Sequence, residues 1–214
     1  MEGFDSLIFD LDGTLLDTSD GIIFTANETA RSLGIPAVDD RSLFEKNFIG
    51  PPLHHGFAAV FGLEGEILEK AVNEYIRLYR ICGGAEMYSY YPGLVEAVRK
   101  LKEMGYRIGV STLKNEQVAE RMLRNSEYGD VFDVIHGSDH TETLTKADII
   151  EMSIEDLHVS RERVLMIGDS ESDLNGAVKT GIPFLAVSWG FGFHSGYGKE
   201  KVAYTSNELL DYLK

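Results

Sequence analysis

The sequence predicts an α/β fold, in which a Rossmann-like parallel sheet carries helices on both faces and an α-helical subdomain is inserted into it. Over the second half of the chain, short apolar runs alternate with helical patterns, which is typical of a parallel sheet covered on both faces. Between the first apolar run, at residues 6–10, and the next, at 107–111, lie helical patterns and no good strand pattern. A length of 214 residues, 43% of them hydrophobic, is enough for such a core and a smaller insert.

Five apolar runs predict the strands of the core. They lie at residues 6–10, 107–111, 131–135, 163–168 and 183–187. Helical patterns separate the later runs, at residues 93–104, 115–123, 147–157 and 173–179. We expect the first of these helices to stop at Gly105 and the last at Gly181, because glycine commonly follows the end of a helix.

The insert is expected to be helical. Its helix-like stretches lie at residues 19–33, 40–48, 53–61 and 64–81, and glycine and proline residues punctuate them. We therefore expect residues 1–16 and 89–214 to form the Rossmann-like core and residues 17–88 to form the helical insert. Several aromatic residues of the insert recur at helical spacing and are interpreted as its core rather than as a pocket lining: Phe44, Phe48, Phe57, Phe61, Tyr75 and Tyr79.

Composition and charge exclude several function classes. A formal net charge of −15 argues against nucleic acid as a partner, because phosphate backbones require a basic surface. No stretch approaches the roughly 20 consecutive apolar residues of a membrane-spanning helix, and the N-terminal residues lack the basic start and apolar run of a signal peptide. The single cysteine, Cys82, is compatible with a reducing cytoplasm. We therefore expect a cytoplasmic protein without a membrane partner, as a monomer or weak homodimer.

Acidic and hydroxyl-bearing side chains follow three of the predicted strands. In an open parallel sheet, ligands bind outside the carboxyl ends of the strands. Three of these ends read Asp10-Leu11-Asp12-Gly13-Thr14, Ser111-Thr112-Leu113-Lys114 and Gly168-Asp169-Ser170-Glu171-Ser172-Asp173. We expect these segments to converge at one edge of the sheet.

The acidic residues at this edge indicate a divalent cation. Asp10 and Asp12 can approach one point, where their like charges repel each other. A bound cation would relieve this repulsion, and so would an Asp12 that stays protonated as a general acid. Asp169 and Asp173 add hard oxygen ligands, which suit Mg²⁺ better than Zn²⁺.

A phosphoryl group would fit the same edge. Gly13 permits a tight turn whose N–H groups can face a phosphate. The hydroxyl of Thr112 and the ammonium of a lysine would then hold the phosphoryl oxygens and stabilise charge in the transition state. These groups together would suit a phosphorylated ligand.

At these residues the sequence resembles the haloacid dehalogenase superfamily of phosphatases. The first motif of that family, DxDGTLxDT, is matched by residues 10–18, and the second, an apolar strand that ends in Thr or Ser, is matched by Thr112. The third motif is a lysine ahead of the last acidic motif, which Lys146 fits, and the fourth, GDxxxD, is matched by residues 168–173. The four motifs occur in order along the chain.

The resemblance implies a role for each residue. Asp10 would attack phosphorus to form an aspartyl-phosphate. Asp12 would protonate the leaving alcohol and then deprotonate the attacking water. Thr112 and Lys146 would hold the transferring group.

The resemblance also implies a metal site and a cap. Mg²⁺ would be bound by the Asp10 carboxylate, the main-chain carbonyl of Asp12 and Asp169, with Asp173 as a further ligand or as a support of the ligands. The helical insert at residues 17–88 would be a cap that closes over the substrate and excludes water.

The resemblance extends to the phosphoglycolate-phosphatase-like branch through residues 48–53, 112–114 and 188–192. Family members often carry Ser or Asn where this chain has Leu113, and often a proline shortly after the lysine that Lys146 matches. These departures leave the fold prediction unchanged and the substrate open. Lys114 is interpreted as a surface or substrate-rim residue rather than a catalytic one.

The leading hypothesis is a Mg²⁺-dependent phosphate-monoester hydrolase that acts on a metabolite such as phosphoglycolate. The alternatives within the superfamily are a 5′-nucleotidase-type phosphatase and a phosphosugar mutase. A cap of this size allows either hydrolysis or the mutase reaction. A dehalogenase has no use for an acid at Asp12 or for a divalent ion. A non-catalytic binding protein would be expected to have lost Asp10, Asp12 or Asp169, and all three are present.

Overall fold

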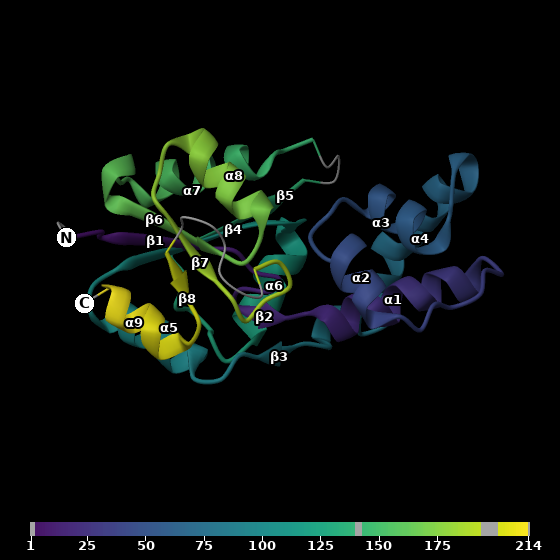
Figure 1. Ribbon diagram of the computed structural model, residues 1–214, viewed down its shortest axis with the longest axis horizontal. Helices are drawn as coiled ribbons and strands as arrows, with labels where there is room; N and C mark the ends of the chain where they lie inside the picture. Colours follow the sequence, from purple (N-terminus) through teal and green to yellow (C-terminus); the bar gives the residue numbers. More distant parts are fainter. Residues whose placement is uncertain (1–2, 140–142, 194–200, 214) are drawn as a thin grey trace. The chain divides into compact units, whose positions relative to one another are not determined.

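The chain divides into two compact units. A computed structural model describes residues 3–139, 143–193 and 201–213 (Figure 1). One unit comprises Met1–Leu16 with Tyr90–Lys214, and the other comprises Asp17–Ser89. The chain passes between them in β2 (Leu16–Asp17) and β3 (Ser89–Tyr90), which pair as a two-stranded sheet. We call the two parts the core unit and the helical unit.

The core unit is built on a six-stranded sheet in which the neighbouring strands run parallel. Its strands, in spatial order, are β5 (Val134–Ser138), β4 (Arg107–Asn115), β1 (Ser6–Phe9), β6 (Val164–Gly168), β7 (Phe184–Val187) and β8 (Val202–Ala203). β1 lies in the middle, where Leu7 is the register partner of both Ile108 and Leu165. The predicted parallel α/β sheet is confirmed.

Helices cover both faces of this sheet, as predicted. They are α5 (Leu94–Glu103), α6 (Glu116–Asn125), α7 (Lys146–Leu157), α8 (Glu171–Thr180) and α9 (Ser206–Leu213), with a short 3₁₀ turn, η2 (Arg161–Arg163). Figure 1 shows α7 and α8 on one face and α5 and α9 on the other. On the α7–α8 face, the apolar core joins β1 and β6 to both helices through Ile8, Met166, Ile150 and Ala177.

Local sequence signals fix the ends of the two helices that carry site residues. α7 begins with a capping box, in which Thr145 and Asp148 satisfy each other's backbone N–H groups. α8 begins with the same device, made by Ser170 and Asp173. It ends at Gly181, whose φ of 72° lies in the left-handed region that favours glycine. Lys146 and Asp173 are therefore each held in a fixed first turn.

One predicted strand is displaced along the chain. The sequence predicted a strand at residues 131–135, whereas β5 spans Val134–Ser138. The apolar residue Phe132 instead packs its ring against Tyr128, with 5.5 Å between the ring centroids. Asp133 binds β4 just before the pairing of β5 with β4 begins. Its N–H donates to the carbonyl of Ile108, and its carboxylate accepts from the N–H of Ile108.

The topology places the chemistry between β1 and β6. These two strands are neighbours, with Phe9 opposite Ile167. The chain that leaves β6 forms α8 on one face of the sheet, whereas the chain that returns to the core unit after β1 forms α5 on the other face. Ligands of open α/β sheets bind at such a switch point, outside the carboxyl ends of the strands.

The helical unit consists of α1 (Ser19–Ser32), α2 (Arg41–Asn47), α3 (Leu53–Phe61), α4 (Gly65–Ile81) and a 3₁₀ turn, η1 (Gly84–Glu86). Its aromatic residues form one cluster, as the sequence predicted. The rings of Phe48 and Phe57 lie 4.9 Å apart, and those of Tyr75 and Tyr79 stack at 5.5 Å. Among the described residues, no helix is both long and apolar enough to cross a bilayer.

The buried start of β6 provides a test of the core. Val164 is fully buried, whereas Val178, on α8, is 68% exposed. We expect Val164→Ala to lower the free energy of unfolding by about 2 kcal/mol, because it removes two buried methyl groups and leaves a cavity. The matched control Val178→Ala should change it by no more than about 0.5 kcal/mol. Urea denaturation of both variants measures the difference, and equal effects would contradict the buried position of Val164.

Candidate active site

Asp10 lies at the carboxyl end of β1, in the middle of the sheet. Its N–H donates to the carbonyl of Ile167 at 2.9 Å, which continues the pairing of β1 with β6. Only 7% of the residue is exposed. Its Oδ1 accepts a hydrogen bond from Nζ of Lys146 at 2.5 Å. Lys146 is the first residue of α7 and is itself buried.

Three buried carboxylates meet at this point. Asp10, Asp169 and Asp173 each place an oxygen within 4.8 Å of the others. Nζ of Lys146 also lies 2.7 Å from Oδ1 of Asp173. Three carboxylates and one ammonium leave two negative charges uncompensated when all four groups are ionised.

Burial and crowding shift the pKa values of these groups. Burial raises the pKa of Asp10 well above its ordinary value; Lys146 opposes the shift, and Asp173 adds to it. Burial, followed by the charge of Asp173, raises the pKa of Asp169 to about 7, even though the N–H of Phe191 opposes the rise. Burial alone would lower the pKa of Lys146, but the Asp10 and Asp173 carboxylates outweigh it and raise that pKa. The raised pKa values of Asp10 and Asp169 mean that the site favours a compensating proton or cation beside these carboxylates.

Asp169 is held in a fixed orientation by donors from two loops. Its Oδ1 accepts from the hydroxyl of Thr14 at 3.2 Å. Its Oδ2 accepts from the N–H groups of Phe191 and Gly192 at 2.7 and 3.3 Å. These two residues follow β7. The sequence did not predict their contact with Asp169, and the glycines at 190 and 192 were the only pattern that could have indicated a close approach of this loop.

Two glycines allow these loops to approach so closely. A Cβ at Gly13 would lie 2.4 Å from Oδ2 of Asp169, and a Cβ at Gly190 would lie 2.2 Å from the carbonyl oxygen of Gly13. Gly13 also has a φ of +87°, which other residues rarely adopt. The sequence predicted that Gly13 permits a turn whose N–H groups face a phosphate. The N–H of Gly13 itself donates to the carbonyl of Leu16, so Gly13 contributes space and backbone conformation, and phosphate binding at this turn stays a prediction.

The two carboxylate oxygens of Asp173 make different contacts, one at the start of α8 and one with Lys146. Its Oδ2 accepts from the N–H and the hydroxyl of Ser170, which caps α8. Its Oδ1 is buried, makes no hydrogen bond among the described residues and forms only the ion pair with Lys146. Capping of α8 and a place in the site are therefore compatible for Asp173.

Asp12 and Thr112 lie beside the cluster rather than in it. The carboxylate of Asp12 is not part of the three-carboxylate group; its Oδ1 lies 3.0 Å from Nζ of Lys114. Thr112 is 1% exposed, and its hydroxyl oxygen accepts from the N–H of Lys114 at 3.1 Å. Lys114 is thus a site neighbour, where the sequence interpretation favoured the surface or substrate rim.

The carboxylate cluster fits a magnesium ion. Carboxylate oxygens are hard ligands of the kind that Mg²⁺ prefers. When all four groups are ionised, the two uncompensated charges equal the charge of the ion. Oδ1 of Asp173, which forms an ion pair with Lys146 but no hydrogen bond among the described residues, is a candidate ligand atom. Asp10, Asp169 and Asp173 are the side chains that would hold it.

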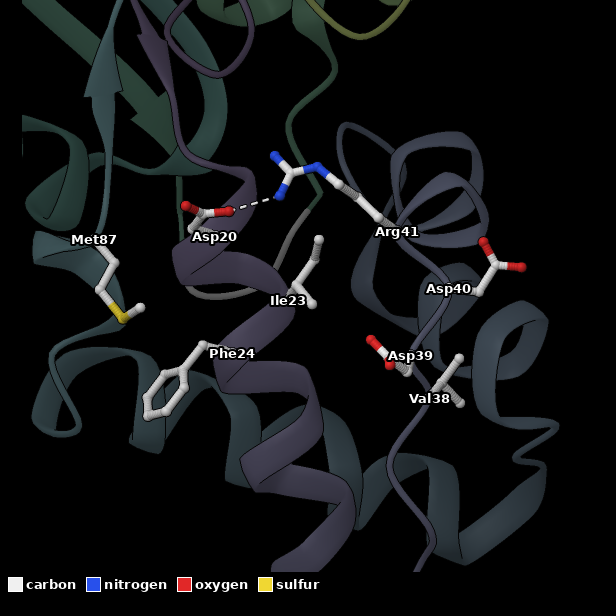
Figure 2. Close-up of a pocket in the computed structure, with 8 residues that line it drawn as sticks. All are labelled: Asp20, Ile23, Phe24, Val38, Asp39, Asp40, Arg41 and Met87. Carbon is white, nitrogen blue, oxygen red and sulfur yellow. Dashed lines mark hydrogen bonds and ion pairs between the residues drawn. The ribbon is translucent and has the colours of Figure 1, made fainter.

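A hollow on the helical unit has a different character. It measures about 430 Å³ and is lined by Asp20, Ile23, Phe24, Val38, Asp39, Asp40, Arg41 and Met87 (Figure 2). Figure 2 shows Arg41 reaching toward Asp20, to which it forms an ion pair at 2.6 Å. Arg41 also pairs with Glu45 at 2.8 Å. No residue predicted for the site lines this hollow.

Comparison with known proteins identifies the relatives of this chain. A profile of haloacid dehalogenase-like hydrolases matches residues 7–187. The tyrosine-protein kinase PtkA of Mycobacterium tuberculosis is 34% identical over 187 residues, which are 87% of this chain but only 62% of that protein. A 5′-nucleotidase of Pseudomonas aeruginosa is 33% identical over 88% of this chain and 85% of its own length.

Solved structures agree with these matches. The structure of a haloacid dehalogenase-like family hydrolase of Streptococcus pneumoniae superimposes with a TM-score of 0.90. It is 33% identical in sequence, and the match covers 100% of both chains.

The raised pKa of Asp169 predicts how stability depends on pH without metal. An aspartate in an unfolded chain has a pKa of about 3.9, whereas that of Asp169 in the folded protein is about 7. Between these values the folded state keeps a proton that the unfolded chain has released, so this group favours folding less and less as the pH rises. In EDTA, the melting temperature of the wild type minus that of Asp169→Asn should therefore be smaller at about pH 8 than at about pH 5.

Added Mg²⁺ should raise the melting temperature of the wild type at about pH 8 more than that of Asp169→Asn, because the ion replaces the proton as the compensating charge. Thermal unfolding monitored by circular dichroism measures both effects. A difference between the two proteins that stays constant with pH would contradict the assignment of the raised pKa to Asp169.

Proposed function

The chain belongs to the haloacid dehalogenase-like hydrolase family, and on this basis we propose that it is a Mg²⁺-dependent phosphate-monoester hydrolase with Asp10 as its nucleophile. One observation carries the proposal. A buried carboxylate at the end of the central strand is held by Lys146 and lies beside two further acids, Asp169 and Asp173. A solvated acidic turn would need none of these supports.

In the first step, a carboxylate oxygen of Asp10 attacks phosphorus, and the bond between phosphorus and the leaving alcohol breaks. Asp12 gives the alcohol oxygen its proton. The products are an aspartyl-phosphate at Asp10 and the free alcohol. Lys146 holds Oδ1 of Asp10 during the attack, because the hydrogen bond fixes the carboxylate in one orientation.

In the second step, Asp12 takes a proton from a water molecule, and the resulting hydroxide attacks phosphorus. The bond between phosphorus and the oxygen of Asp10 breaks, which releases inorganic phosphate and restores the carboxylate. Asp12 is then protonated again for the next cycle. When bound, Mg²⁺ would neutralise part of the negative charge of the phosphoryl group.

Phosphate binding would fall to Lys146 and Thr112. The ammonium of Lys146 is buried and already lies at the nucleophile, where a phosphoryl oxygen must arrive. The hydroxyl of Thr112 is also buried, and since its oxygen accepts from the N–H of Lys114, its proton can point elsewhere. Both groups can stabilise charge on the transferring group.

The substrate is proposed to be a small phosphorylated metabolite. The two relatives are named as a kinase and a 5′-nucleotidase, and both names concern a phosphoryl group. Phosphoglycolate and nucleoside monophosphates are the first candidates, and the helical unit is proposed to be the cap that selects among them. Release of inorganic phosphate across a panel of sugar phosphates distinguishes this hydrolase from a phosphosugar mutase, which would return an isomeric phosphate instead.

Removal of the nucleophile tests the proposal. We expect Asp10→Asn to lower kcat with p-nitrophenyl phosphate and Mg²⁺ by at least about 10³-fold, because the amide cannot form the aspartyl-phosphate. Its melting temperature should stay close to that of the wild type, since the amide is nearly isosteric with the carboxylate it replaces. The control Asp130→Asn changes a side chain that is 97% exposed and should keep full activity. Retained turnover by Asp10→Asn would refute Asp10 as the nucleophile.

A further inference from the structure

Lys114 makes a contact to which the proposed mechanism gives no role. Its Nζ lies 3.0 Å from Oδ1 of Asp12, and the two side chains are only 10% and 14% exposed. Exposed lysine pairs contribute little, because water screens them and the side chains remain mobile. This pair is largely shielded from water, so it restricts both side chains. The structure therefore ties a lysine from β4 to the carboxylate that the mechanism uses for proton transfer.

The backbone of Lys114 is itself held in place. Its N–H donates to the hydroxyl oxygen of Thr112, and the register of β4 against β5 shifts between Ser111 and Asn115. Gly137 of β5 packs against this irregular segment, where a Cβ would lie 2.5 Å from the carbonyl oxygen of Lys114. The neighbouring strand thus fixes the position from which the Lys114 side chain reaches Asp12.

Two lysines contact different acidic residues of the site. Lys146 contacts Asp10 and Asp173, whereas Lys114 contacts Asp12. The Asp12 carboxylate stays outside the cluster that Asp10 forms with the two acids after β6. A separate cation for Asp12 explains how two carboxylates only two residues apart can be directed to different tasks.

We propose that Lys114 is a positioning residue that orients the Asp12 carboxylate for proton transfer, an inference that rests on the proposed function. An ion pair at Oδ1 limits rotation of the carboxylate, so its second oxygen keeps one direction. Proton transfer requires a donor and acceptor at hydrogen-bond distance and in line, and small misplacements are costly. In this proposal Lys114 acts through Asp12.

The leaving group of p-nitrophenyl phosphate allows a direct test. p-Nitrophenolate departs without a proton, so formation of the aspartyl-phosphate from this substrate does not depend on Asp12, whereas its hydrolysis does. In Lys114→Met, the first equivalent of p-nitrophenolate should appear within about threefold of the wild-type rate. Steady-state kcat should fall by about tenfold or more, which is within the usual contribution of general acid–base catalysis. Mass spectrometry of rapidly quenched enzyme should then show phosphorylated Asp10 accumulating.

Matched variants make the result specific. Lys114→Arg keeps a cation near Asp12 and should recover part of the steady-state rate. Lys100→Met removes the same charge from an exposed position on α5 and should match the wild type. Thermal unfolding of all three variants checks their folding, and Lys114→Gln replaces the methionine variant if that one is unstable.

Two results would overturn the inference. An equal fall in the first-turnover and steady-state rates would show that Lys114 binds the substrate phosphate, and unchanged rates would show that it has no role in the reaction. Absence of turnover by the wild-type protein is a separate outcome, because it refutes the proposed hydrolase rather than the positioning of Asp12.

Discussion

The crowding of three buried carboxylates around a single ammonium is the constraint on which the rest of the structure depends. Asp10 and Asp169 follow the ends of the neighbouring strands β1 and β6, Asp173 lies in the first turn of α8, and Lys146 is the first residue of α7. Like charges at such distances would separate if the chain were free to move. The parallel pairing of β1 with β6, the capped first turns of α7 and α8, and the close glycine contacts around Asp169 keep them together. The repulsion that the fold imposes would favour a cation bound between these carboxylates.

The net charge of −15 gives the protein an electric field that repels an anionic substrate such as a phosphate ester. Positive charge at the site itself is needed to offset this repulsion. Within the core unit, however, two lysines contact the acids of the site directly: Lys146 contacts Asp10 and Asp173, and Lys114 contacts Asp12. A divalent ion at the remaining acids would turn the most negative point of the site into one that attracts phosphate. The acidic composition and the proposed substrate are therefore compatible.

The sequence predicted the features that depend on local pattern and motif order. The buried strands, the helices of both units and the meeting of Asp10 with Asp169 followed from apolar runs and from the strand ends at which acids occur. Features that depend on tertiary contacts did not follow. Strand β5 starts three residues late because Asp133 and Phe132 are used elsewhere, and β8 has only two residues, too few for any pattern. No sequence pattern predicts that Lys114 of β4 contacts Asp12, because the direction of its side chain depends on the register shift between β4 and β5.

The charged residues of the hollow on the helical unit argue against phosphate binding in that hollow. Its hollow contains one arginine and three aspartates, and Arg41 is already paired with Asp20 and Glu45. A guanidinium whose donors are engaged by carboxylates has little left for a phosphate. With three aspartates against one arginine, the charged side chains of the hollow are negative in sum when ionised. Lys146 in the core unit differs from Arg41. A cation bound by the acids would compensate their charge, and the ammonium of Lys146 would then be available to a phosphoryl oxygen. The proposed phosphoryl-binding groups are thus those of the core unit, and a contribution of the helical unit to substrate choice would come from contacts with other parts of the substrate.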